Sequence, residues 1–127
     1  MSTRAAFTVP LVPPDVNHYV RHTRTGRHYV TKDATAFKQA VAIYGRNLFV
    51  CAKTFTVSIR IILPACKRGD ADGFIKLVLD AMAAAGIFRD RKGEIVSDAY
   101  VRCLCVMLDT DRRPKHGWTE IVVEALK

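Results

Sequence analysis

Two aspartates and a lysine are spaced so that they could hold a cation and act on a phosphate group. Asp70 and Asp72 stand two residues apart where a helix is expected to begin, and Lys76 follows Asp72 by one turn. Asp90 comes just after that helix should end. Neighbouring carboxylates repel one another unless a cation lies between them. Carboxylates, Mg²⁺ and a basic surface are the ingredients of phosphodiester hydrolysis, which is the chemistry this pattern indicates.

Each of these residues has a distinct role in that interpretation. Asp70, Asp72 and Asp90 are the expected Mg²⁺ ligands, with waters and a phosphate oxygen completing the octahedron and Mn²⁺ as a substitute ion. The ion would orient or ionise the attacking water and neutralise charge on phosphorus. Lys76 would bind the scissile phosphate or stabilise the transition state, and Asp80 would support Lys76 or the fold.

A purely structural interpretation of the same residues stays open. Asp70 or Asp72 would cap the helix, and Lys76 would pair with Asp72 and Asp80 on its surface. This interpretation leaves one carboxylate unexplained. The positive end of the helix dipole accommodates one acidic group well, whereas a second one adds repulsion.

Basic residues outnumber acidic ones by 20 to 12 and gather near the acidic motif. The formal net charge of +8 favours a polyanionic partner, for which nucleic acid is the first expectation. Tyr19 and Tyr29 are interleaved with upstream arginines, a combination that suits branched or locally unpaired DNA. A solvated basic loop is the alternative. The candidate DNA contacts are Arg21, Arg24, Arg27, Lys67, Arg68, Arg91 and Lys92.

The length and patterning predict one small α+β domain over residues 1–127, with a mixed β-sheet and two main helices. No apolar run long enough to span a membrane is present, and no signal peptide opens the chain, so a cytoplasmic protein is expected. The cysteine spacing fits neither a zinc site nor a disulfide framework, which predicts reduced packing residues. The four cysteines are Cys51, Cys66, Cys103 and Cys105.

The predicted elements follow from hydrophobic periodicity and from the positions of proline and glycine. Gly86 is expected to end the second helix as its C′ residue. The ranges are a strand at 5–12, a basic segment at 15–32, a helix at 33–50, a strand at 54–63, a helix at 72–85, one or two strands at 95–108, a loop at 109–117 and a strand at 118–125.

These motifs resemble the RusA-type Holliday-junction resolvases over residues 8–96. That family carries Asp-x-Asp-Asn-x-x-Lys before an apolar helix with Asp-Ala in its middle and Gly at its end, and then an Asp-Asp pair. The matching residues are Asp70, Asp72, Lys76, Asp80-Ala81, Gly86 and Asp90. An N-terminal signature also matches, through Pro13-Pro14, Asn17, Tyr19, Arg21-His22, Gly26-Arg27 and Tyr29.

The resemblance implies a homodimeric, Mg²⁺-dependent endonuclease that resolves four-way DNA junctions by paired symmetric nicks in recombination and repair. A twofold dimer suits a junction because two equivalent sites can cut opposing strands. The resemblance also implies that Asp70, Asp72, Lys76 and the acid near position 90 carry catalysis, and that the protein is phage-related.

Two positions depart from the family pattern. Gly73 replaces the usual Asn, and Arg91 replaces the second Asp of the pair, which is the catalytic one in the family. Asp90 or Glu94 could serve in its place if the loop is shifted. If neither reaches the metal, the resemblance implies a catalytically impaired protein that binds branched DNA without efficient cleavage.

Overall fold

The computed structural model describes residues 3–14, 20–22, 28–30, 32–65, 71–111 and 114–126. The side chains of residues 20–22, 28–30 and 71–73 lie outside this description. No helix in these ranges is both long and apolar enough to cross a membrane.

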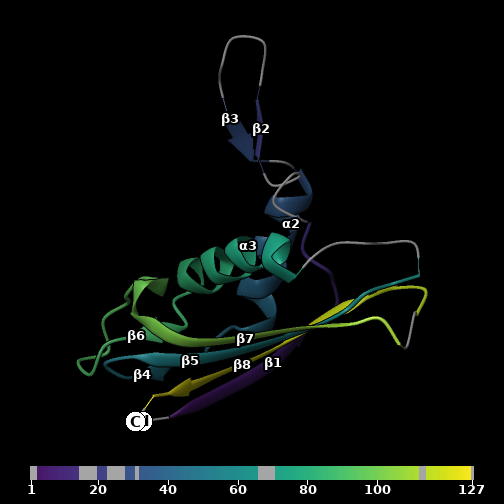
Figure 1. Cartoon of the computed structure of the whole chain (residues 1–127). Coiled ribbons are helices and arrows are strands. Elements are labelled where there is room, and N and C mark those ends of the chain that lie inside the picture. The colour runs from purple at the N-terminus through teal and green to yellow at the C-terminus, as the bar shows by residue number, and fades with distance from the viewer. Residues whose placement is uncertain are drawn as a thin grey trace.

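A four-stranded mixed sheet forms the base of the molecule (Figure 1). Its strand order is β1-β8-β5-β7, with β8 antiparallel to both of its neighbours and β7 parallel to β5. The strands are β1 (Arg4–Val9), β5 (Phe55–Ile62), β7 (Val101–Asp109) and β8 (Trp118–Ala125).

Two helices, α2 (Lys32–Tyr44) and α3 (Ala71–Ala84), pack against each other and cover one face of this sheet (Figure 1). The predicted α+β class with a mixed sheet and two main helices is therefore confirmed. The smaller elements are the antiparallel pair β2 (Val20–His22) and β3 (His28–Val30), the parallel pair β4 (Val50–Cys51) and β6 (Phe88–Arg89), and the 3₁₀ helix η1 (Asp98–Tyr100).

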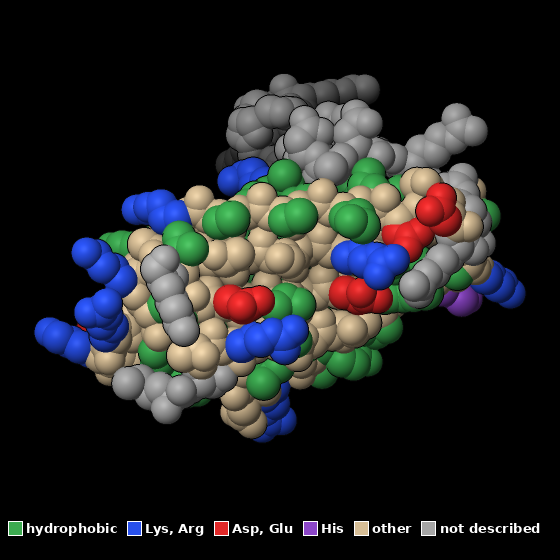
Figure 2. Space-filling view, turned by 60° about the horizontal axis from the view of Figure 1, so that its bottom comes forward, with side chains coloured by type: hydrophobic (Ala, Val, Ile, Leu, Met, Phe, Trp, Pro, Cys, Tyr) green, Lys and Arg blue, Asp and Glu red, His purple; other side chains and the backbone are tan. Residues whose placement is uncertain are grey.

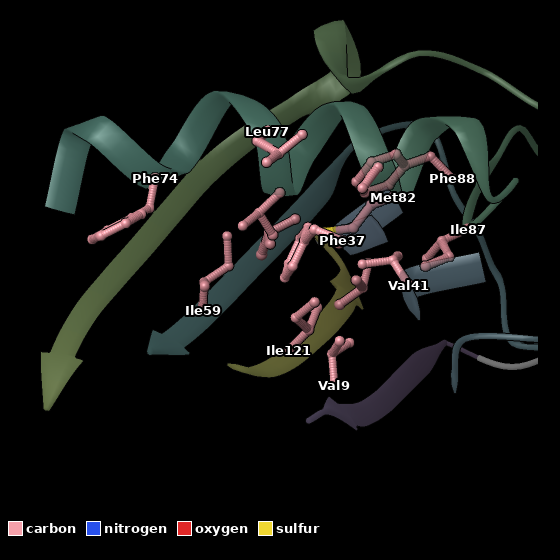
Figure 3. Close-up of a cluster of buried hydrophobic side chains, with 14 of the residues drawn as sticks. Val9, Phe37, Val41, Ile59, Phe74, Leu77, Met82, Ile87, Phe88 and Ile121 are labelled. Carbon is pink, nitrogen blue, oxygen red and sulfur yellow. The ribbon is translucent and has the colours of Figure 1, made fainter. Parts of the chain in front are cut away.

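The core lies between the helices and the sheet because each strand alternates its side chains across the two faces. In β5, Val57, Ile59 and Ile61 are buried while Ser58 is exposed, as the alternation predicts. Figure 3 shows apolar side chains of α2, α3 and the strands meeting in this layer. They include Phe37, Val41, Phe74, Leu77, Met82 and Ile121.

Replacing Phe37 with alanine should destabilise the domain by about 3–5 kcal/mol, because it opens a cavity under α2 where the ring is only 1% exposed. Ile43 on the same helix is 67% exposed, so Ile43→Ala is the matched control and should cost about 0.5 kcal/mol or less. Urea denaturation of both variants measures the difference. Equal losses would contradict the assignment of Phe37 to the core.

The observed structure differs from the sequence prediction in the bounds of several elements and in the place of two cysteines. The first strand ends at Val9 and the first helix at Tyr44, earlier than predicted, while the range expected as strand from residue 95 contains η1 before β7. Gly86 does follow α3 with a left-handed φ of 75°, as predicted. The packing role predicted for the cysteines is wrong for Cys103 and Cys105, which are exposed on β7. Cys66 lies outside the described residues.

The sheet face away from the helices is open (Figure 2). Apolar side chains on this face stand separately among charged ones and small residues. Arg60 and Asp109 form an ion pair here, with Nη2 and Oδ2 2.6 Å apart, which links β5 to the end of β7.

The unit that organises the candidate site is the β5–α3–β7 crossover. Since β5 and β7 are parallel, α3 must return across the sheet between them, so its start lies toward the ends of both strands and its end toward their beginnings. Phe74 marks the first part of α3 and Phe88 follows its other end (Figure 3). At about 1.5 Å per residue, the helix separates these ends by roughly 20 Å.

Candidate functional site

The acidic motif lies at the start of α3. Asp72 belongs to the first turn of this helix, although its side chain is not described, and Asp70 falls outside the described residues. Five of the predicted DNA contacts, upstream of the motif and beside it, also have side chains that the structure does not describe. Of these, Arg21 has a described backbone in β2, whereas Arg24, Arg27, Lys67 and Arg68 lie outside the description.

Lys76 stands one turn further along α3, with its side chain 69% exposed. Its Nζ lies 3.6 Å from Oδ2 of Asp80, which forms the i,i+4 pair considered from the sequence. An exposed pair of this kind contributes only a few tenths of a kcal/mol, so it holds the ammonium loosely. The lysine therefore remains accessible to a phosphate near the helix start.

Asp90 organises a tight loop after β6. Its Oδ1 accepts hydrogen bonds from the backbone N–H groups of Lys92 at 2.9 Å and Glu94 at 3.0 Å. The backbone N–H of Asp90 donates to the Glu94 carbonyl at 2.8 Å, and Gly93 provides the left-handed φ of 89° within the turn. Because both side-chain bonds go to Oδ1, Oδ2 is the oxygen that Asp90 can offer to a cation.

A cleft of about 470 Å³ opens beside this loop. Three cationic side chains line it together with the two carboxylates that the sequence singled out, and the half-exposed ring of Tyr100 forms part of its wall. Such a mixture can hold a phosphate on its lysines and arginine while leaving carboxylate oxygens for a metal. The polar lining residues are Lys53, Asp90, Arg91, Lys92, Glu94 and Tyr100.

Lys53 and Tyr100 are members of this cleft that sequence reasoning missed. The parallel pairing of β4 with β6 aligns Cys51 with Arg89, and the Ala52 N–H donates to the Arg89 carbonyl at 2.9 Å. Lys53 is thereby carried next to the Asp90 loop. Strands of two residues show no hydrophobic alternation, so no pattern in the sequence indicates this contact.

The structure does not bring Asp90 to the start of its own α3. Asp90 follows β6, beyond the helix end, whereas Asp72 lies in the first turn, and the helix between them is about 20 Å long. Among the residues described, no three His, Cys, Asp or Glu side chains come together to hold a metal. The backbone of Asp72 and the Asp90 loop therefore lie toward opposite ends of α3, and Asp70 lies outside the described residues.

Comparison with known proteins adds one finding. A family model described as Endodeoxyribonuclease RusA matches residues 10–98, which include the acidic motif, all of α3 and the Asp90 loop. A search of curated proteins finds no match.

Proposed function

The chain belongs to the RusA endodeoxyribonuclease family, and from this membership we propose that it is a Mg²⁺-dependent, homodimeric nuclease that resolves four-way DNA junctions. Paired symmetric nicks would release two duplexes during recombination or repair. The observation that carries the proposal is the family match, because it spans both acidic positions and the helix between them.

The residues available suit a hard divalent cation. Aspartate and glutamate oxygens are ligands that Mg²⁺ prefers, and Asp90 retains one carboxylate oxygen outside its turn. Bound Mg²⁺ would supply an activated water and neutralise charge on phosphorus. Lys76 would bind the scissile phosphate from the exposed side of α3.

The cations of the cleft would hold the DNA backbone. Lys53, Arg91 and Lys92 line one cavity and are long enough to follow neighbouring phosphates. Tyr100 presents a half-exposed ring on which an unpaired base can stack. Both features favour a branched substrate, in which bases at the crossover are more accessible than in continuous duplex.

A site that uses all three aspartates requires two copies of the chain. Asp72 belongs to the first turn of α3 and Asp90 lies beyond the end of this helix, so one ion cannot contact both within a single copy. We therefore propose that Asp70 and Asp72 of one copy act with Asp90 of the other. The twofold symmetry of a homodimer generates two such sites, which is what paired nicking needs.

A supercoiled plasmid that extrudes a cruciform tests the proposed reaction. Paired nicks across the junction should convert it directly to linear DNA in Mg²⁺, whereas unpaired nicks would give open circles. A plasmid lacking the inverted repeat is the control and should stay supercoiled. Open circles from both plasmids would indicate a nonspecific nuclease and contradict the proposal.

The second candidate function is junction binding without efficient cleavage. It is favoured by Arg91, which lines the cleft at the position where the family has its catalytic Asp, and by the use of Asp90 Oδ1 within the turn. In this case the basic cleft would still recognise branched DNA, but the metal would lack a ligand.

Exchanging Arg91 for aspartate separates these two functions. If Asp90 or Glu94 is the working ligand, Arg91→Asp should change the single-turnover cleavage rate by less than about threefold at saturating protein. A gain of tenfold or more would instead favour the impaired protein. Lys92→Asp is the matched control, because it reverses the same charge in the same cleft without restoring the family position.

A further inference from the structure

The strand β7 presents an open edge. In the part of the chain that the structure describes, β7 ends the sheet and pairs only with β5. It has nine residues, and its sequence contains no proline or lysine. Backbone N–H and C=O groups along an unpaired edge can accept another strand, and natural edges normally carry features that prevent this.

Four of the nine residues of β7 carry exposed apolar side chains. Leu104 is 38% and Met107 54% exposed, and Cys103 and Cys105 are also exposed. The register with β5 sets Cys105 beside Ser58, so the cysteines and Met107 lie on the open face and Leu104 on the helix face. The edge thus exposes apolar groups on both faces.

We propose that β7 is the homodimer interface, pairing antiparallel with β7 of a second copy about a twofold axis through Cys105. This register overlaps all nine residues and makes Cys105 its own partner. It sets Leu104 opposite Val106 of the other copy, and Cys103 opposite Met107. Every exposed apolar side chain of the edge then meets another apolar side chain, and the two sheets become one of eight strands.

Charge and symmetry both favour the antiparallel arrangement. Arg102 lies near the start of β7, so parallel pairing in register would set the two Arg102 side chains beside each other, whereas antiparallel pairing sets Arg102 opposite Leu108 of the other copy. A twofold axis perpendicular to the sheet also keeps the helices of both copies on the same face.

This interface also brings the two parts of the proposed metal site, the Asp90 cleft of one copy and the α3 start of the other, to the same end of the paired β7 strands. In this respect the interface rests on the proposed function. The start of β7 adjoins the Asp90 cleft, since Tyr100 lines that cleft. The end of β7 lies beside Leu63, directly after β5, whose N–H donates to the Asp109 carbonyl at 3.1 Å, and the start of α3 lies toward the same ends of these two strands. Antiparallel pairing therefore places the cleft of one copy toward the α3 start of the other.

Disulfide cross-linking tests the register on the free protein, without DNA or metal. A variant that keeps only Cys105 (Cys51→Ser, Cys66→Ser, Cys103→Ser) should form a linked dimer with diamide, because opposed Cβ atoms lie about 4.5–5.5 Å apart. The matched variant keeps only Cys103, whose two copies would be offset by about 13 Å along the strands and should stay monomeric on a non-reducing gel. No linkage through Cys105, or equal linkage through both, would overturn the proposal.

A charge at the axis gives a second readout. Cys105→Lys should weaken dimerisation on the order of 100-fold in sedimentation equilibrium, because two ammonium groups would face each other. Ser58→Lys adds the same charge one strand inward on the same face and should leave the dimer intact. Dimerisation unaffected by Cys105→Lys would contradict the interface.

These outcomes are separable from those of the nuclease assay. A protein that cross-links through Cys105 but never nicks junctions retains the interface and loses the proposed activity. A dimer that nicks junctions but does not cross-link through Cys105 retains the activity and loses the interface.

Discussion

Asp72→Asn is expected to reduce junction cleavage by at least about 100-fold while leaving junction binding intact or tighter, and Asp70→Asn should behave in the same way. Each change removes a negative charge needed by the metal but unfavourable to the DNA phosphates. Single-turnover cleavage rates and gel-shift affinities measure the two effects separately. Cutting retained in both variants would remove these residues from the metal site.

Asp80→Asn is the matched control for this experiment. It changes the same functional group on the same helix, but the Asp80 carboxylate lies 3.6 Å from Lys76 and is not a proposed metal ligand. Its effect should be several-fold at most, because an exposed ion pair contributes little. A loss of cleavage rate as large as that of Asp72→Asn would show that cleavage depends on the negative charge of the helix in general and not on a metal ligand.

Mixing two inactive variants should restore activity. Asp72→Asn and Asp90→Asn are each expected to be inactive, yet a dimer of one copy of each contains one site with every aspartate intact. Half of the dimers in an equimolar mixture are of this kind, so about a quarter of the wild-type sites should return. The products should be single nicks, because the second site of each mixed dimer lacks both groups.

The mixture also distinguishes where the third acid comes from. A mixture no more active than its components would contradict a site shared between copies. Full activity of Asp90→Asn alone would instead remove Asp90 from the site and direct attention to Glu94, which lines the same cleft. Rates are measured after the subunits have been exchanged by dilution and reconcentration.

Much of the fold could be predicted because its elements carry strong local patterns. The alternation in β5 and the apolar faces of α2 and α3 follow directly from periodicities of two and 3.6 residues. Gly86 marks the end of α3 because glycine, which has no Cβ, adopts the left-handed conformation at a helix end without strain. The mixed sheet follows from a helix that connects β5 to β7.

The arrangement of the candidate site could not be predicted in the same way. Asp72 and Asp90 belong to one motif in the sequence, but the helix between them carries them apart. Lys53 enters the cleft through a two-residue strand pair that leaves no periodic signal. The exposure of Cys103 and Cys105 follows from their place on the sheet face that the helices do not cover, and which face is covered is a tertiary property that a single strand does not encode.

Cleavage of a labelled synthetic four-way junction, compared with linear duplex of the same sequence, tests the central claim most directly. The assay is run with Mg²⁺ and with EDTA. We expect nicks at symmetric positions in two opposing strands of the junction, only when Mg²⁺ is present, and no cleavage of the duplex. Tight junction binding without nicks in Mg²⁺ would contradict the nuclease and leave a protein that only binds branched DNA.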